Sequence, residues 1–307
     1  MVDIALLYEA LMRRGISARP RSERPNISGF LRFGENARYY AKESDNGDGW
    51  LFGDFVDGWN DSVFEKQAKP LNAAQIRQRK REAEKAREKA AEIQAQMWQS
   101  TAQKALKLWQ QAQAADSHYY LSKKQIQAHG IKAAIYNGIK YLVIPASDAS
   151  GKIWTLQYIA PDGRKRFLSG GKKKGCFYII GEPDKQIIVC EGFATGASIN
   201  EATNCAVAVA FDKGNLESVA KAMLLKYPAC RVAIAADNDI KENAPDNVGL
   251  NEAARVAKIY NLTLFIPYLK NGCKCDFNDV AVFEGLDAVK MIFEHGGVEL
   301  VDINKEV

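Results

Sequence analysis

The feature that most constrains the fold is a regular alternation of strand and helix patterns in the second half of the chain. From Lys185 onward, four short apolar runs alternate with helical patterns; the runs are QIIVCEG, CAVAVAF, RVAIAAD and LTLFIP, and the helices include ATGASINEA, NLESVAKAMLLKY, VGLNEAARVAKIYN and LDAVKMIFEHG. Apolar strands separated by helices are typical of a mostly parallel sheet covered on both faces. We therefore predict an α/β domain over residues 184–307.

Acidic residues follow three of these predicted strands. Because an open parallel sheet binds ligands at the carboxyl ends of its strands, the acids are expected to meet at one edge. Clustered carboxylates repel one another unless a cation lies between them, and Mg²⁺ prefers such oxygen ligands. Each acid alone is also explained as a helix cap or turn residue, but the combination favours a metal site. The acids are Glu191, Asp237, Asp239, Asp276 and Asp279.

A basic segment precedes the acidic domain. Residues 117–180 carry 11 basic and 2 acidic side chains, whereas residues 181–307 carry 12 and 19. The turns DASG, PDGR and SGGKKKG separate alternating apolar runs, which predicts an antiparallel β unit over residues 117–183. Its tips display Arg164, Lys165, Arg166, Lys172, Lys173 and Lys174. They are candidates for phosphate binding, although basic hairpin tips are also common on ordinary surfaces.

The first 116 residues divide into two further segments. Residues 1–72 open with a short helical pattern and continue with aromatic bursts between Gly, Asn and Asp, which predicts a small β-rich domain with a candidate role in template recognition. Its aromatics, including Phe30, Tyr40 and Trp50, are expected mainly in its core. Residues 73–116 lack Gly and Pro and are rich in Ala, Lys, Arg and Glu, which predicts one or two solvated helices that act as a linker.

Composition excludes several other classes of protein. The apolar runs are shorter than the ~20 residues of a bilayer span, and no signal-peptide pattern opens the chain, so a cytoplasmic protein is expected. The six cysteines lack the spacing of a disulfide framework or zinc ribbon, and Cys273 with Cys275 is only a minor metal candidate. No Walker-type phosphate loop is present, so a built-in helicase motor is not expected.

At this point the motifs resemble a known family. Glu191-Gly192 after an apolar strand, Asp237-x-Asp239 after another and the late DFND resemble the Toprim domain of bacterial primases, topoisomerases and certain nucleases. The preceding YLSKKQI, GKIWTLQYIAPDGRKRFL and GGKKKG resemble the region before Toprim in primases of conjugative plasmids and phages, and more distantly in the bacterial replicative primase. The resemblance covers about residues 117–300.

The resemblance implies a role for each matching position. Glu191, Asp237 and Asp239 are expected to be catalytic and to hold metal, and Asp276 with Asp279 to hold a second ion. The basic residues named above, with Asn278, are expected to bind nucleic acid or nucleotide. Thr195 stands where the replicative primase has an acid, which removes one possible ligand, and no zinc-binding module precedes the catalytic region.

The function that the resemblance implies is that of a DNA primase. Such an enzyme makes short RNA primers on single-stranded DNA from ribonucleoside triphosphates, with Mg²⁺ or alternatively Mn²⁺. A separate helicase or replication initiator is the expected partner, with no membrane. Two alternatives stay open: a Mg²⁺-dependent Toprim nuclease, and a non-catalytic accessory protein that binds single-stranded DNA.

Overall fold

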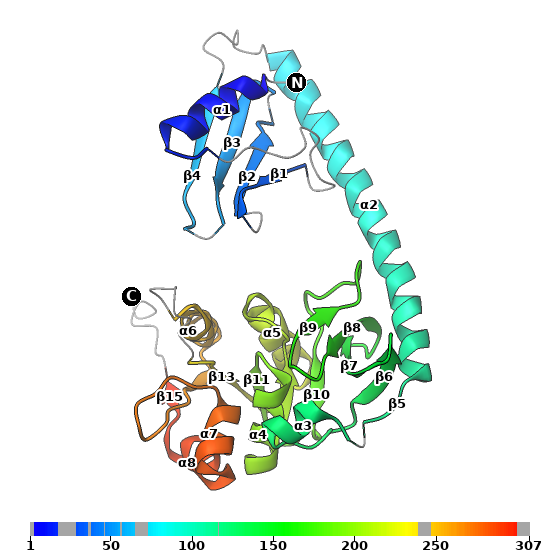
Figure 1. The fold of residues 1–307 in the computed structure, drawn as a ribbon, viewed down its shortest axis with the longest axis vertical. Helices are drawn as coiled ribbons and strands as arrows, with labels where there is room; N and C mark the ends of the chain where they lie inside the picture. The colour runs from blue at the N-terminus through cyan, green and yellow to red at the C-terminus, as the bar shows by residue number, and fades with distance from the viewer. Residues whose placement is uncertain are drawn as a thin grey trace. The chain divides into compact units, whose positions relative to one another are not determined.

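The computed structural model describes residues 3–17, 29–35, 38–45, 47–55, 57–64, 73–115, 117–238 and 247–299. The chain forms two compact units, Met1–Ala91 and Glu92–Val307 (Figure 1). No helix among these described ranges combines the length and the apolar character that a membrane crossing needs.

The first unit is a helix packed on a four-stranded antiparallel sheet. Its elements are α1 (Ile4–Arg13), β1 (Leu31–Phe33), β2 (Tyr39–Glu43), β3 (Gly49–Asp54) and β4 (Asn60–Phe64), and the strands pair in chain order. Leu7 and Leu11 of α1 pack with Phe33, Trp50 and Phe52 in the core. Alternation along each strand places these apolar side chains on the face that α1 covers.

A single helix, α2 (Ala73–Gln111), begins in the first unit and ends in the second. Most of it is exposed, as expected from its charge, but Ala102 and Ala105 are buried. Ala105 packs against Val143 and Leu156 of the sheet that follows. The prediction of a largely solvated helix agrees with most of α2, whereas its last turns form part of a core because small Ala side chains let the helix approach the sheet.

The basic segment folds as a five-stranded antiparallel sheet with one short helix. The strands are β5 (Gln113–Ala114), β6 (Lys132–Tyr136), β7 (Ile139–Ser147), β8 (Ile153–Ile159) and β9 (Lys165–Phe167), paired in chain order, with α3 (Tyr119–Lys124) between β5 and β6. One face carries Leu142, Ile144 and Ile159 into the main hydrophobic core of the unit. β9 forms one edge of this sheet.

The second sheet of this unit has six strands in the order β10-β12-β11-β13-β14-β15. The inner strands β11 (Gln186–Cys190), β12 (Ala206–Val209), β13 (Arg231–Ala235) and β14 (Thr263–Phe265) run parallel, whereas β10 (Tyr178–Ile180) and β15 (Val298–Glu299) pair antiparallel at the edges. The mostly parallel sheet is thus confirmed. The predicted boundary at residue 184 misplaced β10, which pairs with β12 and so belongs to this sheet.

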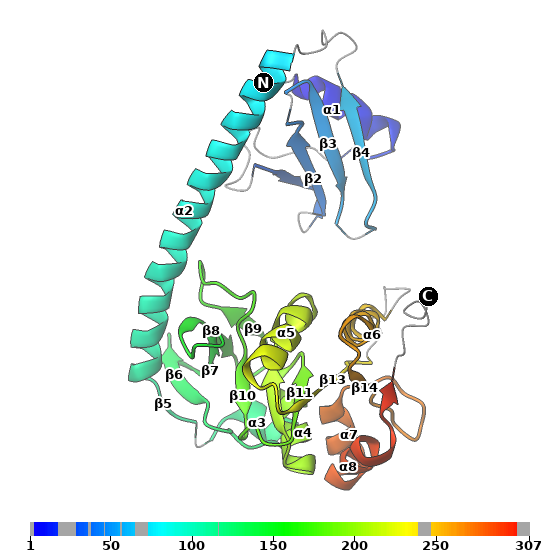
Figure 2. The same cartoon turned by 180° about the vertical axis from the view of Figure 1, so that it is seen from behind.

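Helices cover both faces of the six-stranded sheet (Figure 2). On one face lie α4 (Phe193–Thr203), α7 (Phe277–Glu284) and α8 (Leu286–His295), and on the other lie α5 (Leu216–Lys226) and α6 (Val248–Tyr260), with the 3₁₀ turn η2 (Lys213–Asn215) before α5. The strands alternate between the two cores: Ile188 and Cys190 face one, Ile187 and Val189 the other. All six cysteines are free thiols in this structure.

Candidate catalytic edge

The carboxyl ends of two neighbouring strands bring the first acids together. β11 and β13 pair in parallel, with Val189 opposite Ile234. Glu191 follows the end of β11 directly, and Asp237 lies two residues beyond the end of β13. Both side chains are half-buried and lie at the same edge of the sheet, because parallel strands end on the same side. We call this edge the catalytic edge.

A third acid reaches the catalytic edge through a short backbone bridge. Asn238 N donates to Cys275 O at 3.1 Å, and Cys275 N donates to Asn238 O at 3.0 Å. The side chain of Asn238 also donates to Pro267 O at 3.1 Å, which fixes the loop after β14. Asp276 therefore lies beside the segment that carries Asp237, although many residues separate them in sequence.

The pKa of the buried Cys190 thiol is affected by several charged side chains at the catalytic edge. It is fully buried, and burial raises its pKa well above 9, with further increases from Asp237, Glu191 and Asp276 and a decrease from Lys165. Three acids and one lysine are thus electrostatic neighbours of one side chain. The thiol stays protonated, so we assign it to packing and exclude it as a nucleophile.

Lys165 brings the basic sheet to the catalytic edge. A Cβ atom built on Gly192 would lie 3.9 Å from Lys165 Nζ, so this lysine of β9 lies beside the turn after Glu191. Phe167, two residues further along β9, packs edge-on against Phe211 with 5.5 Å between the ring centroids. Phe211 N in turn donates to Glu191 O at 2.8 Å, and Phe211 holds a left-handed φ of 72°. Such a conformation is unfavourable for Phe and persists only where its surroundings hold it.

Asp276 and Asp279 have a structural role of their own. They form a capping box at the start of α7: Asp279 N donates to Asp276 Oδ1 at 2.8 Å, and Asp276 N donates to Asp279 Oδ2 at 3.2 Å. Burial raises the pKa of Asp276, and the charge of Asp279 raises it further. Lys124 Nζ lies 3.7 Å from Asp279 Oδ1. One oxygen of each carboxylate therefore accepts a hydrogen bond from the backbone at the start of α7.

Asn278 lies inside the protein. Its side chain is 0% exposed, and its Nδ2 donates to Lys124 O at 2.7 Å and to Ser198 Oγ at 3.0 Å. It thereby joins α3, α4 and α7. Complete burial leaves no surface for a nucleotide, so the expected contact is replaced by a packing role that the DFND pattern alone does not reveal.

The basic residues of the antiparallel sheet make different local contacts. Arg164 is exposed and its Nε donates to Asp162 Oδ2 at 2.6 Å. The Arg166 guanidinium lies 4.7 Å from the ring centroid of Tyr141. Of the six, Lys165 is the residue that we can place at the catalytic edge from the contacts of the described chain.

Two lysines of the GGKKKG turn lie near aromatic rings, and the third has an electrostatic effect on an acid. Lys172 Nζ lies 4.9 Å from the ring of Trp154, and Lys173 Nζ lies 5.2 Å from that of Phe167. The ion pair with Arg255 lowers the pKa of Glu217, and Lys174 adds a smaller effect. Gly171 packs tightly, since an added Cβ would lie 2.4 Å from Thr155 Cβ. The lack of a side chain at Gly171 is therefore required by its packing against Thr155.

The donors at the catalytic edge suit a hard cation. Glu191 and Asp237 supply carboxylate oxygens, which Mg²⁺ prefers. Within the ranges that the structure describes, no three His, Cys, Asp or Glu side chains form a group that could hold a metal, and this includes Cys273 and Cys275. Asp239 lies outside the described residues. Thr195, which stands where an acid was expected from the resemblance, is 2% exposed and supplies no charge.

Comparison with known proteins identifies the acidic domain. Residues 186–287 match the family model described as Toprim domain. This part of the chain is a Toprim domain. Its boundaries include Glu191, Asp237 and the α7 capping box, so the catalytic edge is the carboxyl edge of the Toprim sheet.

Relatives and solved structures extend the comparison beyond the Toprim domain. Two Escherichia coli proteins named DNA primase TraC are 38% identical over 160 residues and 46% identical over 125 residues, covering 50% and 39% of this chain. The chain spans only 15% and 9% of their lengths. A DnaG primase catalytic domain bound to ssDNA matches with a TM-score of 0.45 and 14% identity, covering 67% of this chain and 81% of that one.

Proposed function

We propose that the chain is a DNA primase that synthesises short RNA primers on a single-stranded DNA template. The observation that carries this proposal is the meeting of opposite charges at the catalytic edge. Glu191 and Asp237 follow the neighbouring strands β11 and β13, and the backbone bridge between Asn238 and Cys275 brings Asp276 beside the segment of Asp237. Lys165 of the basic sheet lies beside Gly192, the residue after Glu191. Joining nucleotides requires such an arrangement, because phosphates need positive charge while metal ions need carboxylates.

The similarity to relatives supports the same activity. The TraC relatives are named DNA primases, and their longer match covers half of this chain. The match covers only 15% and 9% of those proteins, and we extend their named activity to this chain as part of the proposal. The charges of the two sheets are independent support, since residues 117–180 are strongly basic and residues 181–307 acidic.

The residues at the catalytic edge have distinct proposed roles. Glu191 and Asp237 would hold Mg²⁺ or Mn²⁺, together with Asp239, and Asp276 and Asp279 could hold a second ion through their remaining oxygens. The bound ion would supply activation of the primer hydroxyl and neutralise charge on the phosphates. Lys165 would bind the triphosphate of the incoming ribonucleotide and orient it beside Glu191.

The other partners follow from what the chain would have to do. The remaining basic residues, Arg164, Arg166 and Lys172 to Lys174, would hold the template strand by its phosphates. A separate helicase or replication initiator would open duplex DNA, because the sequence contains no Walker-type phosphate loop. The small N-terminal domain is a candidate for template recognition.

A primer-synthesis assay tests this function directly. The 307-residue chain is incubated with end-labelled single-stranded DNA, Mg²⁺ and ribonucleotides, one of them carrying a second label. We expect short labelled RNA from the wild type, none from Asp237→Ala, and full activity from Glu182→Gln, which changes an exposed acid before β11 at the opposite edge of the sheet. Shortened DNA without RNA would instead identify a nuclease, and RNA synthesis by Asp237→Ala would refute the site.

A further inference from the structure

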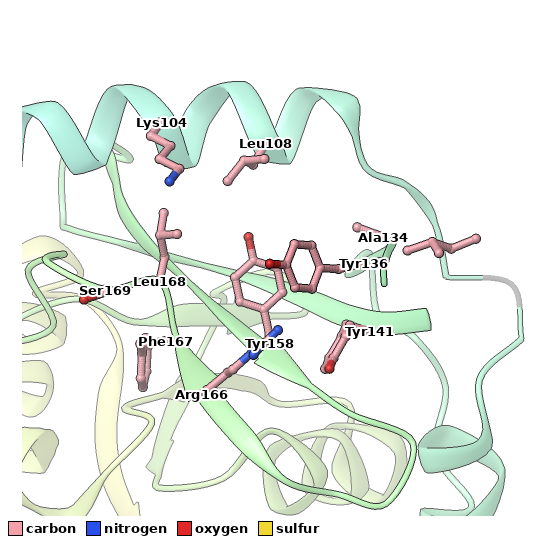
Figure 3. Close-up of a pocket in the computed structure, with 11 residues that line it drawn as sticks. Lys104, Leu108, Ala134, Tyr136, Tyr141, Tyr158, Arg166, Phe167, Leu168 and Ser169 are labelled. Carbon is pink, nitrogen blue, oxygen red and sulfur yellow. The ribbon is translucent and has the colours of Figure 1, made fainter. Parts of the chain in front are cut away.

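A pocket lies on the antiparallel sheet, on the face turned away from the main core. Its volume is about 410 Å³, in the range of small-molecule and cofactor sites. It is lined by Tyr136, Tyr141, Tyr158 and Arg166 from the sheet and by Lys104 and Leu108 from α2. Figure 3 shows the rings and the guanidinium gathered beneath the helix. We call these residues the tyrosine pocket.

The strand registers explain why the tyrosines gather there. Side chains two residues apart on a strand share a face. Val143 and Leu156 lie beneath Ala105 of α2 and form an aliphatic core. Tyr141 and Tyr158 lie two residues further along the same strands, on the same face. The face therefore changes from aliphatic to aromatic beyond the part that Ala105 covers.

Arg166 places a positive charge among these rings. It lies directly opposite Tyr158 in the pairing of β8 with β9. Its guanidinium is 4.7 Å from the ring centroid of Tyr141 and 5.8 Å from that of Tyr136. Tyr141 and Tyr158 meet edge to face, and Tyr136 is 61% exposed. Solvent and ligands therefore have access to at least one ring face next to a cation.

The charges around the pocket favour a polyanion. Residues 117–180 contain only two acids, Asp148 and Asp162. Asp148 accepts from Trp154 Nε1 at 2.6 Å, and Asp162 accepts from Arg164 Nε at 2.6 Å, so both are used locally. Lys104 and Arg166 line the pocket itself. Stacked aromatic rings combined with basic side chains are the means by which proteins hold unpaired bases and their phosphates.

We propose that the tyrosine pocket stacks an unpaired base of single-stranded DNA, and this proposal rests on the proposed primase function for the identity of that strand as template. An acidic peptide could pair with the charges of Arg166 and Lys104, but its binding would not explain why three tyrosine rings line the pocket. β9 connects the two sites: Lys165 lies at the catalytic edge and the next residue, Arg166, lies in the pocket. A strand that passes over this sheet edge would contact both.

Fluorescence anisotropy with two oligonucleotides tests the stacking. One is a labelled oligothymidine, and the other is an abasic strand of the same length and charge; both are measured with the full chain in EDTA. For Tyr136→Ala with Tyr141→Ala, we expect affinity for oligothymidine to fall by about 10- to 100-fold, as for loss of base stacking. Binding of the abasic strand should stay within about 2-fold, because phosphate contacts remain.

Control variants separate stacking from folding. Tyr119→Ala removes a tyrosine of α3 that is 65% exposed and does not line the pocket, and it should bind both strands normally. Tyr136→Phe keeps the ring and should keep the affinity. Tyr136→Ala alone changes an exposed side chain and should lower affinity by about 5-fold even if the double variant is unstable.

The outcomes distinguish this inference from the primase proposal. Equal loss of affinity for both strands would show that the tyrosines do not stack a base and would overturn the proposal. Unchanged affinity for oligothymidine would overturn it as well, and would leave a protein as the ligand of this face. Absence of primer synthesis by the wild type would overturn the primase function, yet leave the binding difference in EDTA unchanged.

Discussion

The two sheets of the second unit use their residues in opposite ways. In the Toprim sheet the inner strands are buried on both faces, so polar groups are confined to the loops at the strand ends. In the antiparallel sheet only one face enters the main core, and α2 covers part of the other. A parallel sheet covered on both faces can therefore offer a site only at its edge, whereas an antiparallel sheet with one exposed face can also offer a site on that face.

The charged side chains are also distributed differently on the two sheets. The Toprim sheet presents acids at its carboxyl edge, whereas the antiparallel sheet presents Lys165 on one side of β9 and Arg166 on the other. We therefore expect substitutions at the Toprim edge to affect the chemical step, and those on the antiparallel sheet to affect binding.

The largest effect is expected for Glu191→Gln. Loss of one carboxylate charge at the catalytic edge should lower kcat of primer synthesis by at least about 100-fold, since changing even the outer partners of metal ligands costs 10- to 100-fold. Asp276→Asn should lose less, because Asn still caps α7. Single-turnover kinetics measure both. Equal losses would show that all the acids serve the metal in the same way.

Lys165→Met should affect binding more than chemistry. If Lys165 binds the triphosphate as proposed, removing its charge should raise KM for ribonucleotides by about 10- to 100-fold, the size of a charge-assisted hydrogen bond. Lys185→Met, which changes an exposed lysine before β11 at the opposite edge of the sheet, should change KM by less than about 3-fold. Steady-state kinetics at several salt concentrations would reveal the difference. Similar effects of both variants would contradict the special position of Lys165.

Gly196→Ala tests the packing of the Toprim domain. A Cβ at this position in α4 would lie 2.9 Å from Val209 Cγ2 and 3.2 Å from Cys190 Sγ. We expect the free energy of unfolding in urea to fall by about 1–3 kcal/mol, as for other overpacked cores. Gly214→Ala, at an exposed turn, should change it by less than about 0.5 kcal/mol. An unchanged Gly196→Ala midpoint would mean that α4 can move away from β12.

The smallest effect is expected for the contribution of Asp148 to stability at low pH. Burial disfavours its ionised form, but hydrogen bonds from Ser150 and Trp154 outweigh burial and hold its pKa below 3.8. A lowered pKa in the folded state stabilises the protein above pH 3.8, and this stabilisation is lost as pH falls through the folded-state pKa. Asp148→Asn should therefore be slightly less stable than wild type at pH 6 and equally stable near pH 2, as thermal unfolding can show.

The sequence predicted the Toprim sheet better than its surroundings. Continuous apolar runs such as QIIVC specify a buried strand locally, so β11 to β14 were expected. β10 was assigned to the wrong sheet, because the choice of its partner β12 depends on contacts distant in sequence. The helix α7 was missed because CDFND was interpreted only as an acidic motif, although it also carries the capping box.

The sequence predicted where on the sheet the candidate site lies, but not the contacts of its individual residues. The rule for carboxyl ends of parallel strands places Glu191 and Asp237 together without coordinates. Asn278, by contrast, lies in a core that three helices form, which no local pattern encodes. Lys165 and Arg166 look equivalent in sequence, yet strand alternation sends them to different sites. The contribution of Phe211, Cys190 and Lys124 also depends on tertiary contacts.

Electron paramagnetic resonance of Mn²⁺ tests the central claim most directly, because bound Mn²⁺ loses the sharp signal of the free ion. Full-length wild type should reduce the free Mn²⁺ signal in a manner that Mg²⁺ reverses. The Glu191→Gln, Asp237→Asn double variant should leave the signal of the free ion intact while retaining a wild-type circular dichroism spectrum. Equal Mn²⁺ binding by the double variant and the wild type would contradict the assignment of the catalytic edge.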